Sequence, residues 1–265
     1  MLYNEFVNFY FQRRIKMKKI ISFALILIMV LSFTACVDPA QEDIMTKSEG
    51  VMTWAEYNAA EINDEVTIEA YVQGKQGWWS DNGVGKATVY LQDGVGGYLL
   101  YDLQCTEEEY AQLVDGVKVR VTGYKAAYKG EYEIIDATFE IIKGSYVAPF
   151  TDATDKLGKE DILNLQNMKV SFKGLTVVGY TYQGGARGKD IYVTFNYNGA
   201  NYDFCVESYL TGADSELYKA IEALKEGDVV DIEGFAYWYD GAYDAVADVV
   251  NPNAINTHIT GVKVK

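Results

Sequence analysis

Hydrophobic and polar positions alternate along several short stretches of the chain. In residues 66–72 every second side chain is apolar, a period that places successive side chains on opposite faces and predicts a half-buried strand. Residues 87–103 predict two more strands, and residues 118–122 and 131–141 predict a further pair. The turns fall at Asp93-Gly94 and at Lys129-Gly130. This part of the chain is therefore predicted to be mainly β.

A different period marks a few short helices between these strands. In "TEEEYAQL" Thr106 and Glu109 have the spacing of a capping box, which satisfies backbone N–H groups at a helix start. The same spacing in "TWAEYNAAE" predicts a short helix after Thr53, with Trp54 as a lid on the end of a barrel. In residues 214–227 the apolar side chains recur at helical spacing. Each helix is short, so the strands determine the fold class.

The pattern then repeats. Residues 114–134, "VDGVKVRVTGYKAAYKGEYEI", align with residues 225–245, "KEGDVVDIEGFAYWYDGAYDA", so that glycines meet glycines and tyrosines meet tyrosines. Upstream, "VTIEAYVQG" matches "VSFKGLTVVG" with one inserted residue. Two copies of about 100 residues are each large enough to bury a core. In each copy the order is three strands, a helix and two strands, which is the order of a five-stranded OB barrel.

The stretches "YLQDGVGGYLLY", "VDGVKVRVTG" and "YKGEYEI" resemble the OB-type domains of bacterial cell-surface lipoproteins and secreted nucleases. The resemblance covers about residues 50–142 well and 157–264 more loosely. It implies an all-β protein with short helices, built as two tandem five-stranded OB-type barrels after a lipoprotein signal peptide. OB barrels bind single-stranded nucleic acids, oligosaccharides and proteins, so the resemblance does not select a ligand.

The first 35 residues predict an export signal. "MKKIISFALILIMVLSFTAC" has two lysines, an apolar run and small residues before Cys36, an order typical of a signal peptide, with Met17 as the expected true start. Cys36 is predicted to be lipidated, which places the protein in the bacterial cell envelope, outside the cytoplasm and anchored to the membrane. An uncleaved membrane anchor is the alternative.

The predicted domains follow from these segments. They are a signal peptide at 1–35, a lipidated cysteine and flexible tether at 36–49, barrel one at 50–146, a linker at 147–158 and barrel two at 159–265.

Charge limits the choice of partners. Without residues 1–35 the chain has 18 Lys and Arg against 37 Asp and Glu, a formal charge of −19. Such a chain repels polyanions unless cations cluster locally. "GARGK" offers two, Arg187 and Lys189, which make a weak phosphate site.

Residue chemistry gives little sign of catalysis. The single histidine, His258, lies in a predicted last strand without a motif partner. Cys105 and Cys205 are predicted to be separate buried thiols that pack as small hydrophobes. Acidic loops, such as the one at Asp81 and Asn82, lack the spacing of a calcium loop. We therefore predict no catalytic residue, no metal and no cofactor.

Aromatic residues gather in the loops where OB barrels hold ligands. The loop joining strands one and two and the loop joining strands four and five flank the ligand face, and flat rings there can stack on sugars or bases. The alternatives are that a tryptophan folds onto its own barrel and that the tyrosines form cross-strand pairs. The predicted ligand-binding residues are Trp78, Trp79, Tyr128, Tyr132, Tyr182, Tyr237, Trp238, Tyr239 and Tyr243.

The sequence thus predicts a non-catalytic cell-surface lipoprotein that acts as a ligand-binding or adhesion module. Its expected partners are the membrane, through a diacylglyceryl group on Cys36, and an extracellular oligosaccharide, peptide or envelope protein. The alternative is an OB-fold protein that binds single-stranded nucleic acid, which the acidic charge disfavours. A carboxylate-based hydrolase is a further alternative.

Overall fold

The computed structural model describes residues 44–239, 243–244 and 249–265. Cys36, the predicted signal peptide and the side chain of Tyr243 lie outside this part of the chain. Residues 47–265 form one compact unit, and the following description is of that unit. No helix in the described residues is long and apolar enough to cross a membrane.

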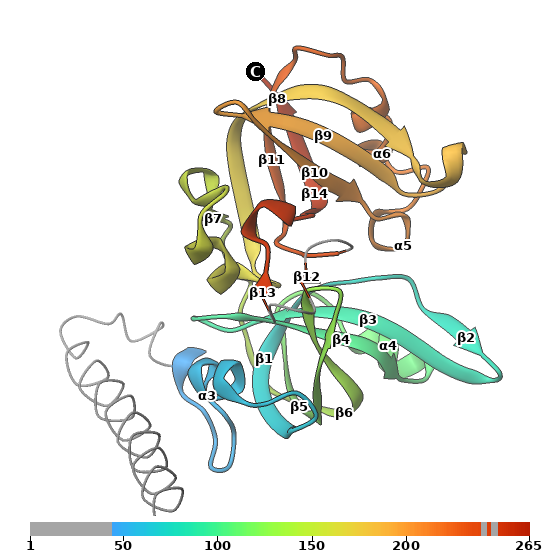
Figure 1. Cartoon of the computed structure of the whole chain (residues 1–265). Coiled ribbons are helices and arrows are strands. Elements are labelled where there is room, and N and C mark those ends of the chain that lie inside the picture. The colour runs from blue at the N-terminus through green and yellow to red at the C-terminus, as the bar shows by residue number, and fades with distance from the viewer. Residues whose placement is uncertain (1–43, 240–242, 245–248) are drawn as a thin grey trace, which may run out of the picture. The chain divides into compact units, whose positions relative to one another are not determined.

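The first sheet closes into a five-stranded barrel (Figure 1). The strands follow one another around it in the order β1, β3, β4, β6 and β5, and β5 pairs again with β1. All neighbours are antiparallel except β4 and β6. A short strand, β2, extends the edge at β3. The bounds are β1 Glu65–Lys75, β2 Trp79–Asp81, β3 Val84–Gln92, β4 Gly97–Gln104, β5 Val117–Tyr128 and β6 Glu131–Ser145.

The second sheet repeats this circuit. Its strands run in the order β8, β9, β10, β14 and β11, and β11 pairs again with β8. As in the first barrel, the strands that are third and fifth in chain order, here β10 and β14, are neighbours and parallel. The bounds are β7 Thr151–Asp152, β8 Lys169–Tyr182, β9 Ile191–Tyr197, β10 Ala200–Val206, β11 Val229–Phe235 and β14 His258–Val264. The prediction of two tandem OB-type barrels is confirmed.

Two small features lie outside these circuits. β12 (Tyr243–Asp244) and β13 (Val249–Val250) pair with each other between β11 and β14. β7, which falls inside the predicted linker, pairs with β8 of the second sheet. The exact domain boundaries remain a prediction.

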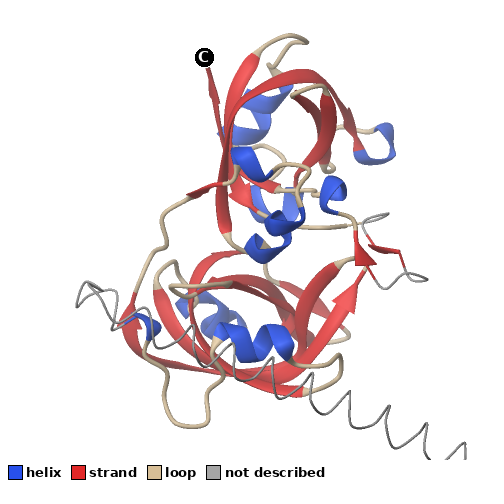
Figure 2. Cartoon of the chain, turned by 60° about the vertical axis from the view of Figure 1, so that its left-hand side comes forward, coloured by secondary structure: helices blue, strands red, loops and turns tan. Residues whose placement is uncertain are grey.

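The helices are few and short, as Figure 2 shows. Both predicted capping boxes are present, with Thr53 and Glu56 at α3 and with Thr106 and Glu109 at α4. The α-helices that lie wholly within the described residues are α3 Trp54–Ala59, α4 Glu107–Gln112, α5 Ser208–Thr211 and α6 Glu216–Glu222. The 3-10 turns are η1 Thr154–Lys156, η2 Glu160–Leu165, η3 Gln183–Gly185 and η4 Pro252–Ala254.

Each barrel buries its own apolar core, because the alternate side chains of every strand point inward. In the first barrel Trp54 packs against this core, as predicted for a lid. Gly96 is required beneath it, since a Cβ at this position would lie 1.7 Å from the Trp54 ring.

A third apolar cluster joins the two barrels. Tyr90 and Leu99, on the outward face of β3 and β4, pack against Phe235 of β11. The rings of Tyr90 and Phe235 stack with centroids 4.3 Å apart. At Gly97 an added Cβ would lie 2.4 Å from the backbone of Asn167, so only glycine allows this close approach. The outward face of β3 and β4 is therefore covered by the second barrel.

Buried hydrogen bonds reinforce this contact. The Gln166 amide donates to the carbonyl of Gly130, at the tip of the β5–β6 hairpin (2.8 Å). The backbone N–H of Trp238 donates to the fully buried carboxyl of Glu131 (2.9 Å). Because buried polar groups are costly without partners, these bonds fix the hairpin against the second barrel.

Candidate ligand-binding cleft

A cleft of about 170 Å³ lies on the outward face of the second barrel. The cleft lies between the loop after β8 and the segment after β11, which are the two loops that flank the ligand face of an OB barrel. Its lining residues are Gln76, Gln183, Asp190, Tyr192, Cys205, Glu207, Tyr237, Tyr239, Asn256 and His258. Only Gln76 comes from the first barrel.

His258 and Tyr237 form an aromatic wall of the cleft. Their rings stack with centroids 4.0 Å apart. Burial lowers the pKa of His258 to about 3, so the ring is neutral at physiological pH. The Gln76 amide donates to the Tyr90 hydroxyl (3.2 Å), and this hydroxyl shares a hydrogen bond with His258 Nδ1 (2.6 Å).

Two carboxyl groups also line the cleft. Burial, followed by the charge of Asp190, raises the pKa of Glu207 to about 7. Glu207 Oε2 accepts the N–H of Leu210 (2.6 Å), and Asp190 Oδ1 accepts the N–H and hydroxyl of Ser208 (2.9 and 2.7 Å). No lysine or arginine is among the lining residues. The cleft therefore suits a flat, uncharged ring better than a phosphate.

Cys105 and Cys205 are free and buried, as predicted. Cys105 packs in the core of the first barrel. Cys205 faces outward into the cleft instead of packing in the core, because the inward positions of β10 are Phe204 and Val206. Burial raises the pKa of the Cys205 thiol, which makes it a poor nucleophile.

An aromatic rim continues beyond the cleft. The ring of Tyr239 lies 6.1 Å from that of Tyr128, at the end of β5. The Lys129 ammonium lies 4.7 Å from the centre of the Tyr239 ring and 5.7 Å from that of Tyr128. These distances allow cation–π attraction. The predicted residues Tyr237 and Tyr239 thus line the cleft, and Tyr128 adjoins it.

The tryptophan pair lies apart from this cleft. Trp78 packs against the first core and donates its indole N–H to the carbonyl of Cys105 (3.1 Å). Gly85 accommodates the ring, since a Cβ there would lie 2.5 Å from it. Trp79 belongs to β2 and is half-buried. Among the described residues, no ring contact joins either tryptophan to Tyr128 or Tyr132. Trp78 therefore matches the alternative in which it folds onto its own barrel.

Three other predicted residues have structural partners. The Trp238 side chain is fully buried and donates to the carbonyl of Asn251 (3.2 Å), so its ring offers no surface for stacking. Tyr132 lies beneath the Lys125 ammonium, 5.0 Å from the ring centre. The Tyr182 hydroxyl donates to Glu222 (2.7 Å).

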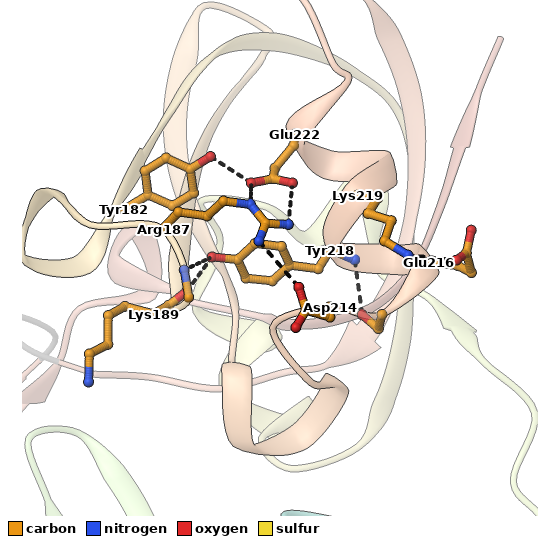
Figure 3. Close-up of polar contacts among 10 residues, drawn as sticks. Tyr182, Arg187, Lys189, Asp214, Glu216, Tyr218, Lys219 and Glu222 are labelled. Carbon is orange, nitrogen blue, oxygen red and sulfur yellow. Dashed lines mark hydrogen bonds and ion pairs between the residues drawn. The ribbon is translucent and has the colours of Figure 1, made fainter.

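Arg187 is paired and does not form a local positive site. Its guanidinium donates two bonds to the Glu222 carboxylate (2.7 and 3.0 Å) and one to Asp214 (3.2 Å), as Figure 3 shows. The hydrogen bonds from Arg187 and then from Tyr182 lower the pKa of Glu222. In the same figure the Lys189 side chain points away from this network. The network ties the loop after β8 to α6.

Sequence reasoning missed most of the cleft. Tyr192 and Cys205 are opposite each other on β9 and β10, and the alternation of apolar residues on these strands was the signal that could have placed both outside the core. Asp190, Glu207, Asn256 and His258 carried no such pattern.

Comparison with known proteins adds the following findings. No family model matches the chain, and no curated protein matches it. Several solved structures are similar at low identity. A murine DNA-binding protein with bound double-stranded DNA has 10% identity and a TM-score of 0.37, over 75% of this chain and 94% of that one.

Two further structures are described as binding single-stranded DNA. The replication protein A heterotrimer has 12% identity and a TM-score of 0.31, over 68% of this chain and 46% of that one. A deletion mutant of the single-stranded DNA-binding protein from Thermus aquaticus has 12% identity and a TM-score of 0.23, over 76% of this chain and 93% of that one. Because these TM-scores are all under 0.5, we base no argument about function on the likenesses.

The predicted partners nevertheless require correction. The sequence led us to expect the membrane, through Cys36, and an extracellular oligosaccharide or protein, with nucleic acid disfavoured. The three structures are instead described by their DNA. The predicted partners are therefore corrected, since these descriptions name neither a membrane nor an extracellular ligand. The prediction had judged partners by the summed charge of the chain, and that sum does not describe any single surface.

Proposed function

We propose that this chain is a non-catalytic OB-fold protein that binds single-stranded nucleic acid through base stacking in the cleft of the second barrel. The observation that supports this most is the position of Tyr192, Tyr237 and Tyr239, which line one cleft on the ligand face of the barrel. Every base has a π face, so tyrosine platforms hold single strands with little sequence preference.

The charges near the cleft define the binding mode. Asp190 and Glu207 disfavour a phosphate inside the cleft, whereas carboxylate oxygens can accept hydrogen bonds from base amino groups. The sugar-phosphate backbone would then lie outside, on the side of the rim where the Lys129 ammonium is 4.7 Å from the centre of the Tyr239 ring. Stacking, and not charge neutralisation, would supply most of the affinity.

The test is fluorescence anisotropy with the full-length chain and a labelled single strand of about 12 nucleotides, within the site sizes of OB barrels. We expect saturable binding that is weaker for the corresponding duplex. If two phosphates are neutralised, affinity falls less than about tenfold between about 50 and 200 mM salt. No saturation at about 100 μM protein, the weak end of ordinary non-specific binding, would overturn the proposal.

A matched pair of variants tests the location. Tyr192→Ala removes a ring from the cleft and should weaken binding about 5-fold or more. Tyr209→Ala removes a ring that is 67% exposed on α5 and does not line the cleft, so it should bind as the wild type does. Equal binding by both variants would exclude the cleft as the binding site.

A further inference from the structure

A buried acid of the first barrel contacts the segment that forms the cleft wall. Glu131, the first residue of β6, is fully buried. Its Oε2 accepts the backbone N–H of Trp238 (2.9 Å), and Trp238 lies between Tyr237 and Tyr239, which both line the cleft. Glu131 itself does not line the cleft. One side chain of the first barrel thus holds the backbone between two of the cleft tyrosines.

Two buried oxygens beside this bond have no hydrogen-bond partner among the described residues. They are Glu131 Oε1 and Asn167 Oδ1. Asn167 Nδ2 donates to the carbonyl of Tyr132, the residue after Glu131 (3.1 Å), and the Asn167 side chain also acts on the pKa of Glu131. The two oxygens therefore belong to neighbouring side chains. The Tyr132 carbonyl fixes the orientation of this amide, because exchanging its N and O atoms would bring two acceptors together.

A proton on Glu131 resolves this arrangement. A neutral carboxyl group is a donor through one oxygen and an acceptor through the other. If Oε1 carries the proton, it can donate to Asn167 Oδ1, and Oε2 still accepts the N–H of Trp238. One hydrogen bond then satisfies both of the remaining oxygens. An ionised carboxylate would instead leave two buried acceptors without a donor, which is costly.

The surroundings of Glu131 also disfavour a negative charge. Burial raises its pKa well above the ordinary value, and the charge of Glu133 raises it further. The Lys125 ammonium, which lies 5.0 Å from the centre of the Tyr132 ring, donates to three carbonyls at the C-terminal end of α3. The other titratable groups whose pKa values a charge on Glu131 would raise are the phenols Tyr57, Tyr90 and Tyr237.

Separate hydrogen bonds hold the backbone around Glu131 against the second barrel. Gln166 donates to the carbonyl of Gly130 (2.8 Å) and accepts the N–H of Tyr132 (3.2 Å). Asn167 donates its backbone N–H to the carbonyl of Ala236 (2.8 Å), two residues before Trp238. The carboxyl of Glu131 is therefore held in place from both sides. The wall segment that it contacts lies beyond the end of β11 and has no regular ladder of its own.

We infer that Glu131 is a positioning residue of the cleft, a neutral acid that donates to Asn167 and accepts from Trp238 and so holds the rings of Tyr237 and Tyr239 in place. The effect on stacking rests on the proposed function, whereas the protonation of Glu131 does not. The first barrel thus acts on the binding site of the second through a residue that the ligand does not touch.

Three variants of the full-length chain test this role. Glu131→Gln keeps an acceptor for Trp238 and provides an N–H donor for Asn167, so it should mimic the neutral acid. Glu131→Ala removes both groups. Glu133→Gln is the matched control, since it neutralises another buried acid on β6 that has no hydrogen bond to the cleft wall among the described residues.

The protonation is measured on the free protein by carboxyl ¹³C NMR with labelled glutamate. The Glu131 resonance is assigned by its absence from the Glu131→Gln spectrum. Exposed glutamates should titrate near their ordinary pKa of about 4.3. The Glu131 resonance should keep its protonated position up to about pH 7. If it moves together with the exposed glutamates, Glu131 is ionised and the inference is wrong.

The positioning is measured by binding of the same labelled strand at about pH 7. Glu131→Gln and Glu133→Gln should bind within about twofold of the wild type, and Glu131→Ala about 5-fold or more weakly, because the wall then spends less time in the competent position. If Glu131→Gln binds as weakly as Glu131→Ala, or if Glu131→Ala binds as the wild type does, the positioning role is wrong. If the wild type does not bind, the proposed function fails, and the NMR titration still decides the protonation.

Discussion

The two barrels share one strand circuit but use its outward face differently. In the first barrel this face carries Tyr90 and Leu99, and both are buried against the second barrel. In the second barrel the corresponding strands carry Tyr192 and Cys205, which line an open cleft. One copy of the repeat therefore uses the face for assembly, while the other keeps it available. Similar folds and similar loops do not imply equal ligand sites.

The largest effect should come from breaking the contact between the barrels. Phe235→Ala removes a ring that is 3% exposed and stacks on Tyr90, so it should lower the free energy of unfolding by about 3–5 kcal/mol. Urea denaturation of the wild type should give one transition and the variant two, because the barrels become uncoupled. A single transition with unchanged stability in the variant would show that the cluster does not couple them. Tyr209→Ala, with an exposed side chain, is the control.

The tryptophan loop offers the next largest effect. Trp78→Ala removes a half-buried indole and its bond to the Cys105 carbonyl, and should cost about 2–3 kcal/mol of stability. Strand binding should stay normal once the protein is folded. Trp79→Ala, the neighbouring control, should cost about 1 kcal/mol or less. If the Trp78→Ala variant is stable but fails to bind single strands, this loop is part of the ligand site and the structural role of Trp78 is contradicted.

The smallest effect concerns pH. Burial raises the pKa of Glu207 to about 7, above its unfolded value, so the folded state binds more protons between these values. Its contribution to stability is present below the unfolded pKa and is lost as pH rises through 7. We expect Glu207 to account for about 2–2.5 kcal/mol of the stability that the wild type loses between about pH 5 and pH 8, and Glu207→Gln to lose correspondingly less.

Urea midpoints measured across this range test the effect. Burial raises the pKa of Glu133 to about 7 as well, so Glu133 also makes the free energy of unfolding depend on pH. The wild type is therefore compared with Glu207→Gln at each pH, because both proteins retain Glu133. Identical pH profiles for the two proteins would contradict the assignment to Glu207.

The sequence predicted the barrels better than the cleft, and the reason is physical. Alternation and capping boxes are local, so the strands and Thr53 and Thr106 as helix starts could be read from neighbouring residues. The cleft brings together Gln76, Tyr192 and His258, which are far apart in the chain and meet only through strand pairing. Its polar residues follow no period that would distinguish them from a solvated surface.

The loop aromatics illustrate the same limit. Tyr237 and Trp238 are adjacent and equally aromatic, yet Tyr237 lines the cleft and Trp238 is fully buried. Successive side chains in an extended segment point to opposite sides, but the sequence does not say which side faces the core when the segment lies outside a regular strand. Trp78 and Trp79 differ for the same reason.

The covered face of the first barrel has a consequence for synthesis. All five strands of this barrel are present once the ribosome has passed Ser145, but Phe235, which covers Tyr90 and Leu99, is made much later. At ordinary translation speeds the interval is about 5–20 seconds. During that time the nascent chain displays an apolar patch beside completed strands, the kind of surface that associates with other nascent chains. Whether the nascent chain avoids aggregation therefore depends on how fast the second barrel is synthesised after the first, or on a chaperone that covers the patch in the interval.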